Sequence, residues 1–423
     1  MAAEPNFFAD PAIIADPRGY FETMRAKGPV ARENHHGTLM VTGYDAAVEV
    51  LTNRDGTYSN ACSVVGPIPE LPFAAAEGAD FREELERHRQ DLPWADHLVC
   101  FDGAKHAEHR ALLGSLLTYK RLKQNEDYLH GLADRLLDGV IGQGPRNVMR
   151  EYAHATTVYA ISDLLGIPLE DRAELLELIG APPSQLDGDA VHKVGPDPLI
   201  FLKPRFDGYL RQRQARPGGD LLSELANASF RDGRKPDLAM LSALARFLFG
   251  AGQDTTSRLI AMAILILGEN PGLQARLRAE PARIPDFLEE ALRHDAPVKV
   301  AYRLAVADTA IGEVPVPAGT LVTVCLSAAN NDPGHFPDPQ RFDIGRPALR
   351  DHLGFSRGAH GCLGAPLGRM EARIAIERLL ARTAAIRISD EHHGPAGQRR
   401  YRFEPTYTFR SLADLYVALD PAD

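Results

Sequence analysis

A single cysteine, Cys362, stands in a glycine-rich segment, GFSRGAHGCLG (354–364), directly before a run typical of a helix. A helix N-terminus carries unpaired N–H groups and a partial positive charge, which favour the thiolate, a soft metal ligand. Gly358 and Gly364 lack side chains, so the backbone can approach a planar group closely, and Phe355 can pack beside it. The spacing Phe-x-x-Gly-x-x-x-Cys-x-Gly indicates one axial ligand to a haem iron. The alternative is a buried structural cysteine on a turn.

A second candidate group lies in AGQDTTS (251–257), in the middle of a long apolar run. Glycine costs about 1 kcal/mol in a helix interior, and threonine hydroxyls compete for backbone carbonyls, so a buried helix gains nothing from this segment. The pattern predicts a local widening of the helix, in which Asp254 and Thr255 pass protons towards bound oxygen. The alternative is a polar patch that faces a solvent-filled cleft.

Together these two segments resemble the signatures of the cytochrome P450 superfamily. Asp254 and Thr255 match the acid–alcohol pair that the family carries in its central helix, whereas Ser356 stands where many members have glycine. The resemblance implies a bacterial-type haem-thiolate monooxygenase that holds haem b between a long central helix and the cysteine segment. The haem-binding signature is filled by Phe355, Gly358, His360, Cys362 and Gly364.

Further residues match the order of the family's landmarks along the chain. Glu290 and Arg293 are three residues apart on one helical face, and the resemblance makes them, with Arg346, a structural lock rather than catalytic residues. Four basic residues match positions that hold the two haem carboxylates by charge-assisted hydrogen bonds. These are His106, Arg110, Arg303 and His360, each of which would by itself be an ordinary surface residue.

The resemblance also implies partners. Electrons would come from NAD(P)H through a reductase and a [2Fe–2S] ferredoxin, and dioxygen would supply the inserted oxygen atom. Because the formal net charge of the chain is −10, a local basic patch near Cys362 would steer an acidic electron donor to it. The alternative is a normally solvated surface. The residues expected in this patch are Lys120, Arg121, Arg357 and Arg369.

The substrate pocket is placed by position along the chain. Two phenylalanines in the expected lining favour a small hydrophobic substrate, either a terpenoid or an aromatic compound, although Lys299 could instead meet a carboxylate. Residues 60–100 and 180–205 are loop-like and are expected to form the roof and the entrance. The expected lining consists of Phe247, Gly250, Ala251, Lys299, Val300, Ala301, Thr408 and Phe409.

The elements that must position these residues are mainly helical. The run from 236 to 268 starts at Pro236–Asp237 and stops before Asn270–Pro271, which predicts one buried helix of about 32 residues. We therefore expect a mainly α fold with a minor β region, the helical prism of a cytochrome P450, in a single domain over residues 1–423. The β-rich parts are expected at about 28–60, 300–330 and 385–420, and the helical parts at about 100–300 and 362–382.

Composition argues against several other classes of protein. The acidic net charge argues against a nucleic-acid partner, and four widely spaced cysteines with no CxxC pair suit a reducing cytoplasm. The start, MAAEPNFFADPAII, has no signal or anchor pattern, so we expect a cytoplasmic monomer without membrane contact. The competing functions are a peroxide-driven peroxygenase, which would not need the acid–alcohol pair, a non-catalytic haem sensor or carrier, and a haem-free helical protein.

Overall fold

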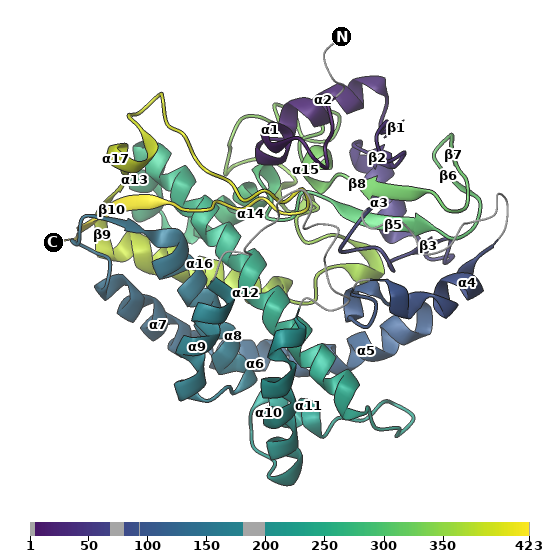
Figure 1. The fold of residues 1–423 in the computed structure, drawn as a ribbon. Helices are drawn as coiled ribbons and strands as arrows, with labels where there is room; N and C mark the ends of the chain where they lie inside the picture. Colours follow the sequence, from purple (N-terminus) through teal and green to yellow (C-terminus); the bar gives the residue numbers. More distant parts are fainter. Residues whose placement is uncertain (1–4, 68–79, 93, 181–198, 423) are drawn as a thin grey trace.

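A computed structural model describes residues 5–67, 80–92, 94–180 and 199–422 (Figure 1). Residues 68–79, 93 and 181–198, which belong to the expected roof and entrance of the pocket, lie outside these ranges. The helices are α1 (Pro11–Ala15), α2 (Arg18–Lys27), α3 (Tyr44–Thr52), α4 (Arg82–Arg87), α5 (Gly103–Leu116), α6 (Tyr119–Gln124), α7 (Glu126–Asp138), α8 (Ala155–Leu165), α9 (Leu169–Gly180), α10 (Lys203–Ala215), α11 (Leu221–Ala226), α12 (Leu238–Glu269), α13 (Pro271–Ala279), α14 (Ile284–His294), α15 (Leu326–Ala329), α16 (Ala365–Arg382) and α17 (Asp390–His393).

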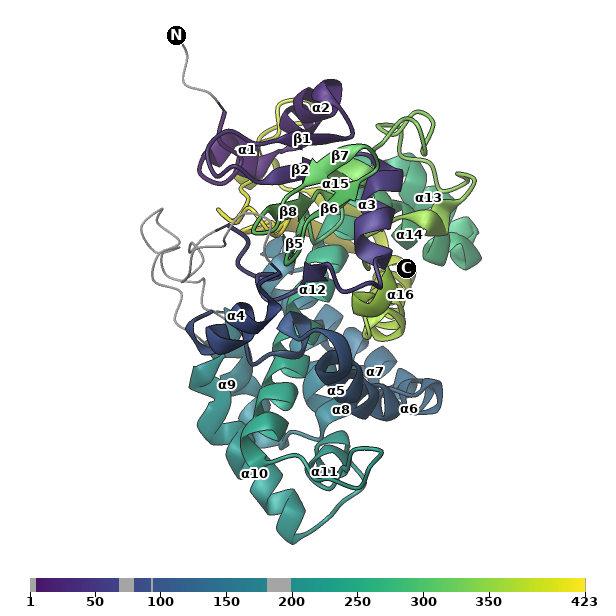
Figure 2. The ribbon, with the colours of Figure 1, turned by 90° about the vertical axis from the view of Figure 1, so that its right-hand side faces the viewer.

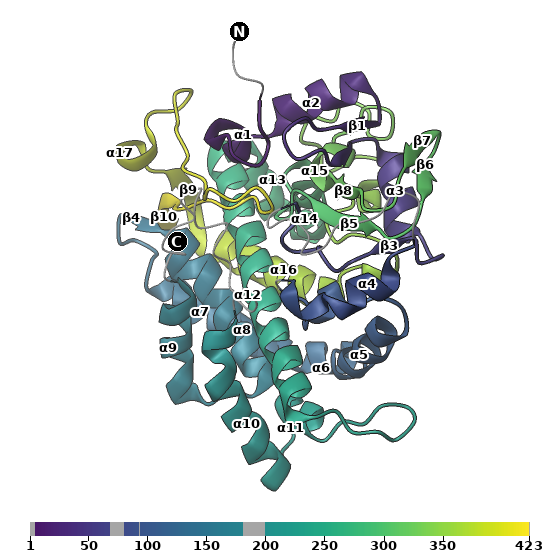
Figure 3. The same cartoon turned by 45° about the vertical axis from the view of Figure 1, so that its right-hand side comes forward.

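Helix α12 runs through the middle of the molecule (Figures 1 and 3) and has nearly the bounds that the sequence predicts. The Asp237 side chain accepts the N–H of Met240 at 2.8 Å and so caps its N-terminus. The first half of α12 packs in a hydrophobic cluster with α5, α10 and α11, and the last part packs in another cluster with α7, α14 and α16. Residues 250–258, between the two, contribute to neither cluster.

The expected widening of α12 is wrong, because the helix is α-helical throughout its length. Residues 251 and 253–256 instead line a cavity beside the helix. A widened, π-helical turn does occur nearby, over Met149–His154, directly before α8. This turn packs against α12, and the His154 ring lies within hydrogen-bond distance of the Gln253 amide oxygen, at 2.8 Å.

The strands form a five-stranded sheet in the order β1-β2-β8-β5-β3, a three-stranded sheet in the order β4-β10-β9, and the β6–β7 hairpin. In the five-stranded sheet β2 pairs with β8 in parallel, and the other pairs are antiparallel. Figure 2 shows this sheet with α1 to α3 at one end of the molecule and α5, α7, α8, α10 and α11 at the other. The strands are β1 (Val30–Arg32), β2 (Leu39–Val41), β3 (Tyr58–Ser59), β4 (Pro145–Asn147), β5 (Ala301–Ala305), β6 (Thr309–Ile311), β7 (Val314–Val316), β8 (Leu321–Val324), β9 (Thr383–Ile388) and β10 (Tyr416–Pro421).

One strand lies where the sequence predicts helix. Strand β4 lies inside the region expected to be helical, because residues 145–147 pair with β10 from the far end of the chain.

Among the residues that the structure describes, no helix combines the length and the apolarity that crossing a membrane requires.

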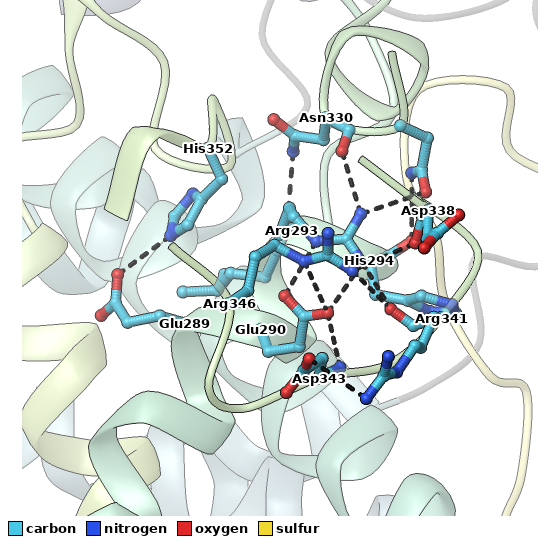
Figure 4. A network of polar contacts seen from close by, with 12 residues as sticks. Glu289, Glu290, Arg293, His294, Asn330, Asp338, Arg341, Asp343, Arg346 and His352 are labelled. Carbon is cyan, nitrogen blue, oxygen red and sulfur yellow. Dashed lines mark hydrogen bonds and ion pairs between the residues drawn. The ribbon is translucent and has the colours of Figure 1, made fainter. Parts of the chain in front are cut away.

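A buried ion pair holds helix α14 to the long loop that follows α15 (Figure 4). Glu290 and Arg293, whose side chains are both 0% exposed, make two hydrogen bonds of 2.8 Å. Glu290 also accepts the backbone N–H of Asp343 at 2.9 Å and the guanidinium of Arg346 at 3.3 Å, and Arg293 donates to the carbonyl of Asn330 at 3.0 Å. Both charges are thus compensated by groups spread over residues 330–346.

The lock leads to a stability prediction. Arg293→Met leaves the Glu290 carboxylate buried without its two-bond partner, so the free energy of unfolding should fall by about 3–5 kcal/mol, measured by urea denaturation. Arg341→Met is the control, because that side chain is 71% exposed on the same loop, and it should change the value by no more than about 0.5 kcal/mol. Equal urea midpoints for the two variants would contradict the stabilising role of the Glu290–Arg293 pair.

Candidate functional site

A cavity of about 470 Å³ lies between the middle of α12, the cysteine segment, strand β5 and the hairpin of residues 402–413. Most of its lining is apolar. Many of the predicted site residues line it: Phe247, Gly250, Ala251, Asp254, Thr255, Val300, Ala301, Arg303, Phe355, His360, Cys362, Thr408 and Phe409. Lining residues that the sequence reasoning did not single out include Asn60, Ser63, Trp94, Leu199, Gln253, Thr256, Leu292 and Leu326.

Cys362 is positioned by the turn before it and by helix α16 after it. Its backbone N–H donates to the carbonyl of Phe355 at 2.8 Å, and α16 begins three residues later at Ala365. The side chain is exposed to the cavity that it lines. Burial raises the pKa of the thiol, while the N–H groups of Gly364 and Ala365 and the charge of Arg110 act in the opposite direction. The site therefore supplies the groups that would stabilise a thiolate once a metal ion replaces its proton.

Two of the four glycines of this segment, Gly358 and Gly364, differ in the space around them. Gly358 has a φ of +72°, and a Cβ there would lie 2.2 Å from the carbonyl oxygen of Leu51. A side chain at Gly364 would meet only the Cys362 sulfur, at 3.9 Å. Neither glycine is among the described residues that line the cavity. The requirement for glycine at Gly358 thus comes from the end of helix α3, and the expectation that Gly358 and Gly364 give a cofactor room stays a prediction.

The four predicted carboxylate-binding residues come together at one end of the cavity. The rings of His106 and His360 stack with centroids 3.8 Å apart, and Arg110 donates to the carbonyl of Gly361 at 2.6 Å. Burial, Arg110 and other nearby cations lower the pKa of His106 to about 4. Burial, Arg303 and the other two members lower the pKa of His360 to about 2. A dianion bound among the four side chains would oppose both causes, because its charge favours the protonated imidazoles and attracts the two guanidinium groups.

The acidic member of the predicted proton path is held by an ion pair that the sequence reasoning missed. Arg258 donates to Asp254 at 2.7 Å and 3.1 Å, and to Glu404 at 2.9 Å. Its guanidinium also lies 5.0 Å from the centre of the Phe409 ring. The Thr255 hydroxyl donates to the carbonyl of Ala251, one turn earlier, at 3.2 Å. The i, i+4 spacing of Asp254 and Arg258 was the signal that could have found the pair.

The expectation that Lys299 lines the pocket is wrong. Its side chain is buried, and the Nζ atom donates to the carbonyls of Ile14 and Thr406, each at 2.7 Å. Neither Lys299 nor its two partners are among the described residues that line the cavity, so the amine does not meet a substrate carboxylate there. Its neighbours Val300 and Ala301 do line the cavity.

The predicted basic patch is largely neutralised within the molecule. Arg121 pairs with Glu224, Arg357 lies 3.7 Å from Asp351, and Arg369 makes two hydrogen bonds to Glu289, at 2.6 Å and 2.9 Å. Lys120 is exposed. A groove of about 320 Å³ crosses this face, and its lining includes Tyr119, Lys123, Arg350, Arg369 and Arg373.

The residues present fit a haem. The cavity is lined by a thiol at a helix N-terminus, by the basic side chains Arg303 and His360, and by mainly apolar walls elsewhere. His106 and Arg110 lie next to His360 and complete a group of four cationic or potentially cationic side chains. These are the donors that one soft axial ligand and two carboxylates require. Cys362 would hold the iron, and His106, Arg110, Arg303 and His360 would hold the carboxylates.

Comparison with known proteins agrees with this fit. The family model described as Cytochrome P450 matches residues 208–384. The chain is 35% identical over 310 residues to a vitamin D(3) 25-hydroxylase of Pseudonocardia autotrophica, covering 71% of this chain and 75% of that protein. It is 31% identical over 348 residues to the cyclomarin C epoxidase CymV of Salinispora arenicola, covering 79% and 88%. The substrate-free structure of Mycobacterium marinum cytochrome P450 CYP150A6 is 41% identical, with a TM-score of 0.91 over 99% of both chains.

The contrast between the two glycines gives a prediction. Gly358→Ala should lower the free energy of unfolding by at least about 1–3 kcal/mol, because alanine is strained at a positive φ and its Cβ would strike the Leu51 carbonyl. Gly364→Ala, with open space for the added Cβ, is the matched control and should unfold within about 0.5 kcal/mol of wild type. Chemical denaturation of the haem-free proteins measures both, and a reversed order would refute the assignment.

Proposed function

The chain belongs to the cytochrome P450 family of haem b monooxygenases, and on this premise we propose that Cys362 is the axial ligand and that the substrate is a small apolar molecule. The observation that carries the proposal is the cavity that the Cys362 thiol, Arg303, His360 and the middle of α12 face together, with His106 stacked on His360. The fold matches that of the family, as the sequence predicts.

Each group of residues then has a separate task. Haem, when bound, supplies an iron that takes up electrons one at a time and activates dioxygen. Cys362 donates electron density from its thiolate, which the N–H groups of Gly364 and Ala365 keep in place. Arg110 and Arg303, with the stacked histidines, bind the carboxylates and fix the orientation of the ring plane.

Proton delivery falls to Asp254 and Thr255, which line the cavity from α12. The Thr255 hydroxyl can give its proton into the cavity when it turns away from the Ala251 carbonyl, and it is then recharged through the Asp254 carboxyl. The hydrogen bond from Arg258 holds the Asp254 side chain in one rotamer. A peroxygenase would not need this pair, which is why the oxygen-dependent reaction is preferred.

For the substrate, a terpenoid or an aromatic compound suits the lining. Phe247, Leu199, Val300 and Phe409 provide apolar contacts, and the buried position of Lys299 removes the one argument for a carboxylate at that place. The named relatives are a hydroxylase and an epoxidase, so either kind of oxygen insertion is compatible with the family.

For the electron donor we propose a [2Fe–2S] ferredoxin with an NAD(P)H-dependent reductase. The groove lined by Tyr119, Lys123 and Arg350 is also lined by Pro366 and Arg369. These two residues belong to the first turns of α16, which directly follows the cysteine segment, so the groove lies near that segment. Because three of the predicted basic residues are already paired, and Lys123 in the groove is paired with Glu126, long-range attraction of the donor would depend more on Lys120. The enzyme would work in the cytoplasm as a single-domain monomer.

The ligand assignment is tested by the spectrum of the reduced protein with carbon monoxide. Wild type should give the red-shifted Soret band of a thiolate-ligated iron, and Cys362→Ala should lose it. Cys325→Ala is the matched control, because that cysteine is buried against β8 and should leave the band unchanged. A red-shifted band that survives in Cys362→Ala rules out the assignment.

The proton path is tested by counting products. Thr255→Ala should still oxidise NAD(P)H but should divert much of it to hydrogen peroxide, because the hydroxyl that hands over the proton is missing. Thr256→Ala serves as control, since that hydroxyl points to the crossing with Gly368 of α16. An unchanged yield of product per NAD(P)H in Thr255→Ala would remove this residue from the path.

A further inference from the structure

The hairpin of residues 402–413 carries two side chains into the cavity. Thr408 and Phe409 lie at its turn and line the cavity. The turn is paired with the chain before β5: Lys299 N–H donates to the Thr408 carbonyl, and Arg410 N–H to the Pro297 carbonyl, both at 2.8 Å. These backbone bonds fix one side of the turn.

The other side of the turn is held by the Lys299 side chain. This side chain is 1% exposed, and its Nζ bridges the carbonyl of Thr406, in the turn, and that of Ile14, in helix α1. Ile14 is 285 positions from Lys299, so the contact joins distant parts of the chain. The last carbonyls of a helix have no partner within it and readily accept hydrogen bonds from cations.

A second buried cation makes a parallel connection. Arg410 donates to the carbonyl of Ala15, the last residue of α1, and pairs with Asp295 at 3.0 Å. Its guanidinium also lies 3.6 Å from the centre of the Phe403 ring, on the first arm of the hairpin. Two consecutive carbonyls of α1 are therefore each bound by a cation that belongs to the hairpin or to its partner strand.

We infer that Lys299 is a positioning residue for the substrate pocket: it clamps the turn of residues 406–409 to helix α1, so that the N-terminal helix determines where Thr408 and Phe409 stand beside the substrate. The part of this inference that concerns substrate rests on the proposed function, whereas the clamp itself does not. Lys299 does not line the cavity, and the proposed reaction assigns no step to its amine.

The clamp holds in either charge state of the amine. Burial lowers the pKa of Lys299 to about 7, reinforced by Arg410 and Arg258 and opposed by Asp295 and Asp16. These four are the charged groups that face it from the hairpin, from α12, from the end of α14 and from the end of α1. A neutral amine keeps two N–H bonds, which equals the number of its carbonyl acceptors, so loss of the third proton leaves both hydrogen bonds intact.

The test compares Lys299→Met with Lys27→Met, a matched change at an exposed lysine on α2. Methionine fills a similar volume without a donor. In Lys299→Met, amides of residues 404–411 and 11–16 should exchange with deuterium faster than in wild type, in protein without substrate. The substrate dissociation constant from spectral titration should rise about three- to tenfold, as expected for one or two lost hydrogen bonds, and the ratio of products should change. Lys27→Met should match wild type in all three.

A second measurement checks the burial of the amine without any haem chemistry. The unfolded chain keeps Lys299 protonated up to about its ordinary pKa of 10.5, while the folded protein releases the proton near pH 7. Between these values the unfolded state binds more protons, so the free energy of unfolding of wild type should rise with pH relative to Lys299→Met. A pH-independent difference together with wild-type exchange rates in Lys299→Met would mean that the amine is solvated, and it would overturn the clamp.

The remaining outcomes are also decisive. Wild-type exchange rates and product ratios in Lys299→Met would overturn the inference while leaving the monooxygenase intact. A wild-type protein without the thiolate band would overturn the proposed function, while the exchange and pH measurements would still judge the clamp. If Lys299→Met does not fold, Lys299→Gln replaces it: faster exchange than wild type over residues 404–411 and 11–16 supports the clamp, and wild-type exchange contradicts it.

Discussion

Two adjacent buried carboxylates on helix α14 hold together the half of the molecule that carries the thiol. Glu290 binds Arg293 and Arg346, and Glu289 binds His352 (Figure 4). Glu289 also accepts two hydrogen bonds from Arg369. Burial alone would raise the pKa of Glu289, but the hydrogen bonds from Arg369 and His352 bring it down to about 2, so the carboxylate stays charged. A buried charge is costly when it loses its partners, and this cost fixes residues 330–369 against one helix.

The cysteine segment begins where this network ends. His352 donates to Glu289 from Nε2 at 2.9 Å and accepts the N–H of Gly354 on Nδ1 at 3.1 Å, which sets its tautomer. Arg369 lies 4.4 Å from the centre of the Phe355 ring, the residue whose carbonyl binds Cys362. The thiol is thus connected to α14 through a short series of buried contacts. The basic cluster beside it works in the opposite sense, because burial and the charges of Arg110 and Arg303 keep His106 and His360 neutral until an anion joins them, which links cofactor binding to the stability of the fold.

What could be predicted from the sequence was local. The bounds of α12 followed from Asp237 and Pro271, and the family followed from the spacing around Cys362, because caps and short motifs depend on neighbouring residues. Long-range packing could not be predicted in this way. Gly358 is required by the Leu51 carbonyl, and the Lys299 amine is bound by Ile14, and neither partner leaves a mark near the residue that it constrains. The supposed widening of α12 failed for a related reason, since a helix beside a cavity tolerates the same polar residues that a distorted helix would.

Helix α12 is gripped at its two ends by different hydrophobic clusters, and residues 250–258 between them belong to neither. The middle of the helix is held instead by directional contacts: the His154 ring lies 2.8 Å from the Gln253 amide oxygen, and Arg258 joins Asp254 to Glu404. A hydrogen bond weakens steeply when its distance or angle changes, whereas apolar burial is non-directional. A relative shift of the two cores would therefore act first on the hydrogen bonds around Asp254, the place where protons are handed over, and only later on the packing of either cluster.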